Sequence, residues 1–426
     1  MAQTTSSVLT EFYRYLYAPG RVRRFMNERM ALKSKIDSLP DAELGGRGQF
    51  ILPIEKDLPE GVYGNTEGGA IGTALAPSFT EATYSLQEIH SVLEVTWKAM
   101  SDSRNNKMAF GRAAKRGEKS LKLATLLDLN NMMLGDGRGV LASLPGADNT
   151  SPITVSRPIR ARRGMVVDIM DTDDDTKHLD SGTISAVDYA ANTITVSGSV
   201  TSTAASDYFV REDQADDSVN DALSLNGITG IVDTDNPASI VGNYGGINRS
   251  TAGNEFWESV VLANSGTNRS LTEDLILNAI HDARLQGGGE TDMILTSPAV
   301  FRRYFELAAQ DRFFTQDAKG KFSASLGPKD AVNKSKAGAT GFDFGGIPIH
   351  IDDFAEANTL FGLDTSTFMW GHGINDVPQL IGDIFPEATS LRQTSNTSFE
   401  IVLWGAYELI CDNPSGNWKV EDISES

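Results

Sequence analysis

The chain has almost no cysteine, since Cys411 is the only one among its 426 residues. A single thiol cannot form an intramolecular disulfide, so the fold cannot depend on an oxidising compartment. We expect Cys411 to be a small, buried, apolar side chain. No apolar run approaches the length of about 18 residues that a membrane-spanning helix needs, and the first ten residues lack the features of a signal peptide. We therefore expect a soluble protein without a membrane partner.

Basic residues are scarce relative to acidic ones: 37 Lys and Arg stand against 57 Asp and Glu, giving a formal net charge of −20. A phosphate-rich polymer repels such a chain unless its basic residues are segregated, which disfavours a general nucleic-acid or anionic-membrane binder. Hydrophobic residues make up 40% of the sequence, enough for sizeable cores, which excludes a disordered protein. The length fits about three domains.

Motifs of catalysis and metal binding are missing. The five histidines are scattered, without an HExxH motif or a pair at helical spacing, so nothing predicts a zinc site. There is no GxSxG nucleophile motif and no P-loop. We therefore predict no catalytic, cofactor-binding or metal-binding residues and no cofactor. We expect structural roles for the histidines, which are His90, His178, His281, His350 and His372.

Two segments have superficial likeness to ligand motifs. Residues 135–139 (GDGRG) have glycine spacing similar to a dinucleotide motif, but they end a predicted helix instead of following a strand and opening one. Residues 171–175 (DTDDD) put aspartates at the first, third and fifth places of a calcium loop. Thr176 and Gly182 then occupy the places that require glycine and glutamate. We interpret the first segment as a helix end and the second as a solvated turn, with calcium binding as the alternative.

A long helix is predicted over residues 107–134, roughly 40 Å at 1.5 Å per residue. Its second half is apolar almost all round, which requires cover from every side, and Gly135 to Gly137 end it. We expect it to run from a surface into a core. Its first half has one apolar side and one basic side, which we call the basic face of the long helix: Arg112, Lys115, Arg116, Lys119 and Lys122.

Residues 45–80 are rich in glycine and proline, which indicates loop and hairpin structure. A strand is predicted at 49–54, and apolar and polar residues alternate in a return strand from 83 to 99. Such a strand would span on the order of 50 Å. Because a lone two-stranded ribbon is marginally stable in water, we expect a neighbouring copy of the protein to hold it. This feature points to assembly.

The first 44 residues indicate an arm rather than a domain. Helical spacing runs through residues 8–17 and 22–39, interrupted at Pro19 and Gly20. We interpret their basic residues as a solvated or partner-facing surface, with nucleic-acid contact as the alternative. At a second basic cluster, residues 157–163 (RPIRARR), salt bridges or inter-subunit contacts are favoured over phosphate binding.

Residues 152–215 predict a small, barrel-like insertion with strands at 165–170, 182–188 and 192–196. Farther along, Ser270 begins a capping-box pattern (SLTE) for a helix that runs through Leu285 and stops at the three glycines that follow. Ser297 and Pro298 would start a second helix through residue 309. The predicted class is α+β with a mixed or antiparallel sheet, because strands and helices follow no regular βαβ order. The further strands are 292–296, 347–351, 359–363, 367–370 and 399–403.

In order and spacing, these features resemble the tailed-bacteriophage major capsid protein family with the Hong Kong 97-type shell fold. The strongest likeness covers residues 61–142: GVYGNTEGGAIG, the strand ending in WKAMS, and the long helix leading to GDGRGVLA. The others are LNGITGIVD (225–233), YGGINRSTAGNEFW (244–257), the helix, strand and helix of residues 271–307, and the C-terminal FEIVLWGAYELICDNPSGNWKV (399–420).

The resemblance implies an α+β fold with six parts. Some members of this family link hairpin lysines covalently to asparagines of neighbours. Lys56 is the only lysine near the hairpin tip and has no recognisable partner, so we do not expect that chemistry here.

The six parts that the resemblance implies are an N-terminal arm (1–44), an extended E-loop hairpin (45–82), the P-domain strand and spine helix (83–151), a β-rich insertion domain (152–215), the A domain with its connections (216–398) and a C-terminal return to the P domain (399–426).

The function implied is that of a structural, non-enzymatic major capsid protein. It would self-assemble as hexamers and pentamers into an icosahedral shell around the double-stranded DNA of a tailed bacteriophage. Scaffolding, portal and decoration proteins are the further partners implied, with weak, non-specific contact to DNA. The chain would belong to the virion capsid and assemble in the host cytoplasm. An encapsulin-like nanocompartment shell is the alternative, and a soluble oligomeric enzyme is a remote one.

Overall fold

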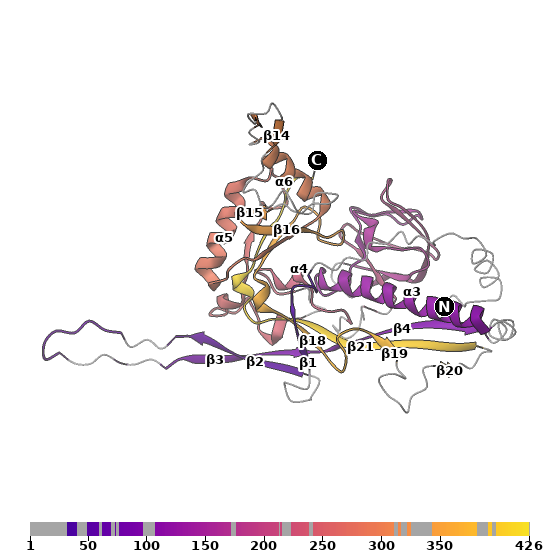
Figure 1. Cartoon of the computed structure of the whole chain (residues 1–426), viewed down its shortest axis with the longest axis horizontal. Coiled ribbons are helices and arrows are strands. Elements are labelled where there is room, and N and C mark those ends of the chain that lie inside the picture. The colour runs from indigo at the N-terminus through magenta and orange to yellow at the C-terminus, as the bar shows by residue number, and fades with distance from the viewer. Residues whose placement is uncertain are drawn as a thin grey trace.

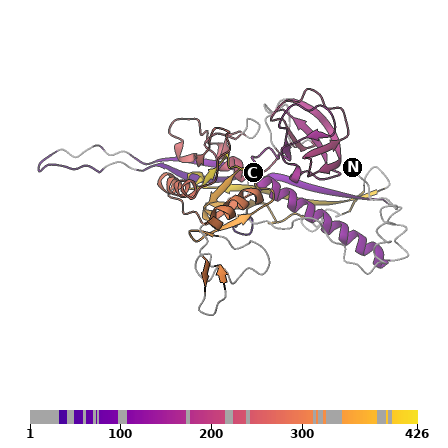
Figure 2. The same ribbon diagram turned by 90° about the horizontal axis from the view of Figure 1, so that it is seen from above.

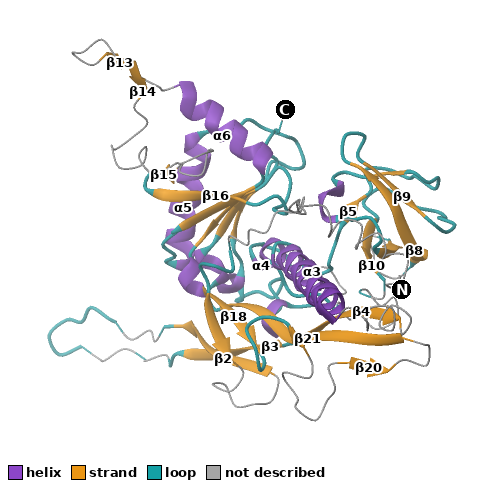
Figure 3. Ribbon diagram, turned by 45° about the vertical axis from the view of Figure 1, so that its right-hand side comes forward, coloured by secondary structure: helices purple, strands orange, loops and turns teal. Residues whose placement is uncertain are grey.

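The structure is a computed structural model that describes residues 32–40, 49–58, 62–69, 73, 76–96, 107–171, 176–212, 214, 223–237, 242–310, 314–316, 322–324, 343–380, 391–393 and 398–425. Within these residues the strands form three six-stranded sheets and two two-stranded ones (Figure 1). No helix of the described part is both long and apolar enough to cross a bilayer. The combination of helices with mixed sheets confirms the predicted class (Figure 3).

The first sheet, the β21 sheet, is built around its longest strand. The antiparallel strand β4 follows one edge of β21, and β18, β19 and β20 follow the other edge in succession. The prediction of 399–403 found only part of β21. The bounds are β1 (Asp37–Pro40), β4 (Gln87–Thr96), β18 (Phe368–His372), β19 (Gln379–Leu380), β20 (Leu391–Gln393) and β21 (Ser398–Cys411).

Strand β1 corrects the helical interpretation of residues 22–39. Residues 37–40 lie parallel to β18, with Asp37 opposite Met369 and Pro40 opposite His372. Just before it, Leu32 and Ile36 are buried in the core. The pairing with a strand more than 300 residues away therefore overrides the local helical spacing here. The predictions for residues 1–31 lie outside the described residues.

The predicted long helix is confirmed as α3 (Lys107–Met133), which lies along the β21 sheet beside β4 (Figure 1). Lys119 and Ser120 are exposed, whereas residues 129–135 are all buried, so the helix does run from a surface into a core. Gly117 permits its close approach to β4, because a Cβ there would meet Leu93 Cδ2 at 2.8 Å. Farther along, Thr125 Oγ1 donates to Ser91 Oγ at 2.8 Å.

A two-stranded hairpin projects from the end of the β21 sheet (Figures 1 and 2). It consists of β2 (Gln49–Asp57) and β3 (Ser78–Ser85), which pair antiparallel from Gln49 opposite Ser85 to Asp57 opposite Ser78. The prediction of one return strand over 83–99 was wrong in its bounds. Strand pairing begins at Ser78 and is interrupted at Leu86, because β3 pairs with β2 whereas β4 pairs with β21.

The second sheet, the β8 sheet, forms a separate small unit beside α3 (Figure 2). Its strand order is β5-β10-β7-β8-β9-β6 around an apolar cluster of its own. The predicted strands 165–170, 182–188 and 192–196 are confirmed, and β5 extends the unit ahead of residue 152. The bounds are β5 (Ala142–Ser143), β6 (Ile153–Thr154), the 3-10 helix η2 (Pro158–Arg160), β7 (Val166–Met170), β8 (Lys177–Asp188), β9 (Thr193–Val196) and β10 (Tyr208–Arg211).

The third sheet, the β12 sheet, has the order β11-β22-β17-β12-β16-β15 with parallel and antiparallel pairs. Buried residues of α5 and α6 belong to its apolar cluster. The two predicted helices and three of the predicted strands, 292–296, 347–351 and 359–363, are therefore confirmed. The bounds are β11 (Val260–Leu262), α5 (Glu273–Gly287), β12 (Met293–Thr296), α6 (Pro298–Gln310), β15 (Asp343–Phe344), β16 (Ile347–Ile351), β17 (Leu360–Leu363) and β22 (Trp418–Val420).

The helix caps differ in one respect from the prediction. The N-cap of α5 is Thr272, whose side chain accepts from Leu275 N, and not Ser270. Gly288 ends α5 in the left-handed conformation at φ 66°, as the glycine run predicted. Ser297 caps α6 as expected, because its Oγ accepts from Val300 N at 3.4 Å.

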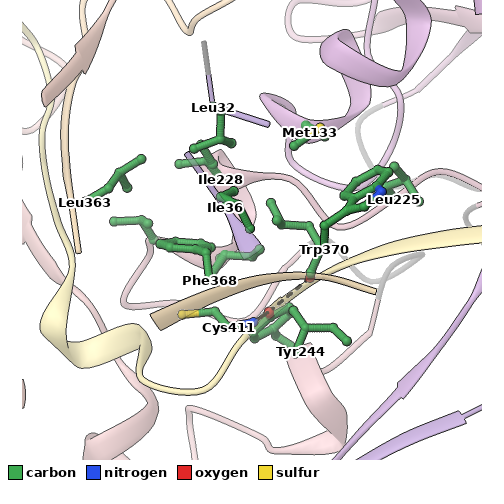
Figure 4. Packing of buried hydrophobic residues seen from close by; sticks show 14 of the residues in the cluster. Leu32, Ile36, Met133, Leu225, Ile228, Tyr244, Leu363, Phe368, Trp370 and Cys411 are labelled. Carbon is green, nitrogen blue, oxygen red and sulfur yellow. Dashed lines mark hydrogen bonds between the residues drawn. The ribbon is translucent and has the colours of Figure 1, made fainter. Parts of the chain in front are cut away.

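The largest apolar cluster lies where α3, the hairpin base and the β21 sheet meet. It includes Met133, Leu225, Ile228, Tyr244 and Trp370 (Figure 4). Sequence-distant segments thus share one core. The remaining elements are α4 (Ile228–Ile231), η3 (Tyr244–Gly246), η4 (Glu255–Trp257), β13 (Phe314–Gln316), β14 (Phe322–Ala324), η5 (Thr365–Thr367) and η6 (Pro414–Gly416).

Candidate assembly interface

The hairpin exposes large apolar side chains that its own chain does not cover. Leu58 is 77% exposed, Val62 99% and Phe79 67%. Ile51 and Tyr63 are exposed as well. Five large apolar side chains on so thin a ribbon have no core of their own to enter, so a surface outside this subunit is needed to remove them from water.

The base of the hairpin, in contrast, is firmly attached to the body of the subunit. Phe50, Ala82 and Tyr84 are buried, and Gly245 of η3 lies so close that a Cβ there would meet Ala82 Cβ and the Tyr84 ring at 3.2 Å. Tyr84 OH donates to the carbonyl oxygen of Cys411 at 2.8 Å. The direction in which the hairpin projects is therefore set by packing at its base.

Lys56 has a polar partner within its own chain. Its Nζ donates to Asn254 Oδ1 at 3.2 Å and lies 5.8 Å from the centre of the Phe256 ring. The sequence did not suggest this pairing, because nearly 200 residues separate the two positions. The contact attaches the outer part of β2 to the segment before η4.

The basic face of the long helix is described only from residue 117 onward. There Lys119 is exposed, and Lys122 Nζ lies 3.1 Å from Oε1 of Glu118 on the preceding turn. The side chains of Arg112, Lys115 and Arg116 lie outside those described. In the described part, Lys119 is thus an exposed lysine without an ion pair, and Lys122 belongs to a surface ion pair. Such a pair contributes only about 0.3–0.5 kcal/mol to helix stability.

The basic cluster at residues 157–163 joins the β8 sheet to the rest of the subunit. Arg162 forms an ion pair with Asp128 of α3, and Arg211 of β10 approaches the same carboxylate at 2.5 Å. Arg157 Nη1 donates to Ala355 O at 3.0 Å, and Arg160 donates to the carbonyl oxygens of Val140 and Phe354. The favoured salt-bridge interpretation is confirmed for Arg162, and these contacts are within one subunit.

The two likenesses to ligand motifs have different outcomes. Residues 135–139 follow the end of α3, as predicted, and Asp136 Oδ2 accepts from Arg138 Nε at 2.9 Å. The Arg138 guanidinium lies 4.6 Å from the centre of the Tyr208 ring, so the segment supports the β8 sheet. Most of the DTDDD segment, residues 172–175, lies outside the described residues. The predicted solvated turn, with calcium binding as its alternative, therefore stays a prediction.

The histidines do not converge within the described part of the chain. His178 Nε2 lies 3.3 Å from Asp207 Oδ2, and His372 Nδ1 lies 3.0 Å from Gly373 O, whereas His90 and His281 are exposed. Among the described residues no three His, Cys, Asp or Glu side chains are grouped as a metal site would require. Cys411 is completely buried as expected, and burial raises the pKa of its thiol to about 12.

Arg249 and Glu408 are two of the buried ionisable residues that the sequence analysis did not single out. The guanidinium of Arg249 donates to the carbonyl oxygens of Gly230, Ile231, Asp235 and Trp257 and thereby fixes the chain around α4. Glu408 of β21 accepts from Asn226. The available signal for Glu408 was an acidic residue inside an otherwise apolar strand (AYELIC), which the prediction of a short strand at 399–403 did not reach.

A hollow of about 240 Å³ lies between β4, α3 and the segment after β10. Its lining includes Ser91, Thr125, Asp128 and Arg211. Ser91 and Thr125 are hydrogen-bonded to each other, and Asp128 is paired with two arginines. The carboxylate is thus engaged in holding the β8 sheet in place and is poorly suited to act as a general base.

Comparison with known proteins gives a family and a fold. Several solved structures are similar over nearly the whole chain. The cyanophage A-1(L) capsid asymmetric unit has a TM-score of 0.54 at 11% identity, covering 95% of this chain and 96% of that one. The capsid of the native GTA particle has a TM-score of 0.46 at 10% identity, with coverage of 99% and 100%. The holo-SrpI encapsulin complex from Synechococcus elongatus PCC 7942 has 0.41 at 8% identity, with coverage of 100% and 98%.

No curated protein sequence matches the chain significantly. The similarity to the cyanophage structure shows the fold of a phage capsid protein, which agrees with the Hong Kong 97-type resemblance. A family model, that of the SU10 major capsid protein, matches residues 204–423, just over half of the chain. That family is structural, not enzymatic. The chain therefore belongs to the SU10 major capsid protein family and is the major capsid protein of a tailed phage.

Proposed function

We propose that this capsid protein assembles as hexamers and pentamers into an icosahedral head shell, with the β2–β3 hairpin acting as an E-loop that lies across a neighbouring copy. The observation that carries the proposal is the projecting hairpin with its uncovered apolar side chains. Burying Leu58, Val62 and Phe79 against a neighbour would contribute on the order of 5 kcal/mol per contact. Many such contacts, each modest, are suited to a closed shell made from one chain.

The division into parts is proposed in the same sense: an arm (1–44), the E-loop (45–82), a P domain with α3 as its spine helix (83–151), an insertion domain (152–215), an A domain (216–398) and a C-terminal return (399–426). Support comes from the pairing of β21 with β4, which brings the C-terminal part back to the strand after the hairpin. Strand β22, in the same C-terminal part, pairs with β11 and β17 of the β12 sheet.

Charge complementarity suggests where the hairpin would lie. Among the described residues of the hairpin, the exposed acidic side chains are Glu55, Asp57, Glu67 and Glu81, with Lys56 as the nearby cation. The basic face of the long helix offers the opposite charge. At physiological salt, where screening acts over about 8 Å, such an attraction operates only between surfaces in contact. We therefore place the hairpin of one subunit near the basic face of the next.

The contents and partners of the shell are proposals as well. A net charge of −20 per subunit disfavours a tight grip on packaged double-stranded DNA, so any contact should be weak, sequence-independent and sensitive to salt. Assembly in the host cytoplasm with scaffolding and portal proteins, and decoration of the finished shell, follow from the family resemblance.

Electron microscopy of the expressed protein, alone and with candidate scaffolding protein, tests the proposal. We expect closed shells for the unchanged chain and their loss in the variant L58S/V62S/F79S. The matched control is Y189S, which removes a 59%-exposed ring from the β8 sheet unit and should leave assembly intact. Shells formed equally well by all three proteins would contradict the role of the hairpin. Nuclease-protected DNA in particles supports a phage head, whereas an enclosed enzyme would support the nanocompartment alternative.

A further inference from the structure

A buried carboxyl group with one unsatisfied oxygen in the described part of the protein lies on β21. Glu408 is only 1% exposed. Its Oε1 accepts from both the backbone N and the side-chain Nδ2 of Asn226, each at 3.1 Å. Its Oε2 is buried and has no hydrogen-bond partner in the described part of the protein. This arrangement fits a protonated carboxyl, whose carbonyl oxygen accepts both bonds, better than a carboxylate with one uncompensated oxygen.

The position of Glu408 relates it to the hairpin. It directly precedes the stretch of β21 to which the hairpin base is attached. Tyr84 of β3 donates to Cys411 O at 2.8 Å. Tyr244 of η3 accepts from Cys411 N at 2.7 Å and donates to Leu409 O at 3.3 Å. The hairpin, η3 and the segment of Asn226 therefore meet on four consecutive residues, 408–411.

Within the described part of the chain, no cation compensates an ionised Glu408. Among the described residues it takes part in no ion pair, and Arg249 directs its guanidinium to backbone carbonyls. The nearby phenols of Tyr84 and Tyr244 are neutral, because burial raises the pKa of both well above the usual value. The other ionisable residues on the adjoining strand segments are His372 of β18, Tyr407, Cys411 and Asp412.

We propose that the carboxyl group of Glu408 is a pH-sensitive switch at the base of the hairpin: protonated, it holds residues 223–232 against β21, and ionised, it weakens this contact and lets the hairpin base shift. An unpaired charge in such a site carries a large desolvation cost, which the protein relieves by rearranging or by admitting water. The switch is a property of the single subunit. Only its effect on shell formation depends on the proposed function.

The direction of the pH effect follows from linkage. Burial outweighs the hydrogen bonds from Asn226 and from the backbone of Leu409 and raises the pKa of Glu408 from its ordinary 4.5 to about 8. The folded state therefore holds this proton more tightly than the unfolded state. The stabilisation is complete below about pH 4.5 and is lost progressively as the pH rises to about 8.

The test compares the full-length protein with E408Q, which imitates the protonated group, in thermal unfolding from pH 5 to pH 9. The wild-type midpoint should fall more than that of E408Q, by at least about 3 °C across this range. The control E400Q, at a half-buried position of the same strand, should follow the wild type. Parallel curves for the wild type and E408Q would overturn the proposal.

A second variant keeps the proposal testable if E408Q does not fold. N226A removes a side-chain donor that lowers the pKa of Glu408, so this pKa should rise further in the variant. The decrease in stability with increasing pH should therefore continue to a higher pH than in the wild type. Hydrogen exchange, corrected for intrinsic rates, should show residues 78–85 and 223–232 less protected at pH 9 than at pH 6. Unchanged protection would contradict the switch. Absence of shells at every pH would instead contradict the proposed function and leave these unfolding curves unaffected.

Discussion

The hydroxyl of Tyr84 donates to the carbonyl oxygen of Cys411, 2.8 Å away and 327 residues later in the chain. Both groups are buried, so the bond joins the base of the hairpin to the central strand of the β21 sheet where no water can replace it. The orientation of the whole hairpin depends on the contacts at its base. We therefore expect substitutions at these few buried residues to affect assembly strongly.

The variant Y84F should lower the free energy of unfolding by about 1–3 kcal/mol, because it leaves a buried carbonyl oxygen without its donor. Urea denaturation measures the change. Y63F is the control, since Tyr63 OH donates to Thr73 O at 2.6 Å in an exposed part of the hairpin. A loss in Y63F as large as that in Y84F would show that burial of the bond is not what matters.

The ion pairs of Asp128 should hold the β8 sheet unit against α3. D128N removes the charge that Arg162 and Arg211 share, and we expect a destabilisation of about 1–2 kcal/mol, reduced by the partial exposure of the group. Thermal unfolding and limited proteolysis near residues 140–163 measure it. E118Q, which breaks only the surface pair with Lys122, should change stability by less than about 0.5 kcal/mol. If D128N lost no more stability than E118Q, the ion pairs of Asp128 would contribute no more than an exposed surface pair.

Charge reversal on the basic face of the long helix should weaken assembly. K119E/K122E should raise the protein concentration needed for shells several-fold at low salt, and the difference should shrink at high salt because screening removes the attraction. Light scattering during assembly measures this concentration. The control R163E also reverses a charge, at an exposed position of the β8 sheet unit, and should change the concentration needed for shells very little. A salt-independent defect in K119E/K122E would point to misfolding instead.

Cys411 should resist alkylation as long as the protein is folded. Burial raises the pKa of its thiol to about 12, so almost no thiolate exists at pH 8, and reagent has no access to the sulfur. Mass spectrometry should find maleimide on Cys411 only after denaturation. The variant Y189C offers an exposed thiol for comparison and should react at once. Rapid labelling of the folded wild type would mean that β21 opens readily.

Mature particles boiled in detergent should yield single-subunit bands. The expectation rests on the sequence, in which Lys56 is the only lysine near the hairpin tip, and agrees with the structure, where that lysine bonds Asn254 of its own chain. A ladder of higher bands would reveal covalent links between subunits.

Local pattern was sufficient for elements whose neighbours lie close by in the chain. The 3.6-residue spacing and the absence of proline placed α3 within a residue at each end, and Ser297 with Pro298 placed the start of α6. The alternating residues of β7, β8 and β9 identified the β8 sheet. In each case propensity, patterning and tertiary packing favour the same structure.

Distant partners explain what the sequence did not predict. The apolar positions change from even numbers up to Leu86 to odd numbers from Ile89, and the prediction of a single strand missed this break, at which β3 pairs with β2 and β4 with β21. The spacing of residues 22–39 favoured a helix, yet β18 draws residues 37–40 into a strand. Thr272 and Ser270 are both good caps, and the position of the first helical residue decides between them. The Lys56–Asn254 and Glu408–Asn226 contacts likewise depend on approach in space.

The arrangement of the β21 sheet also determines when a newly made chain can fold. Strands β1 and β4 leave the ribosome early, but their partners β18 and β21 follow some 300 residues later. At about 5–20 residues per second, translation separates them by roughly 15–60 s. Because the base of the hairpin is attached to β21, we expect a nascent chain to lack a fixed hairpin until β21 has been made. The order of the strands along the chain would then delay the proposed contact between subunits until after that point.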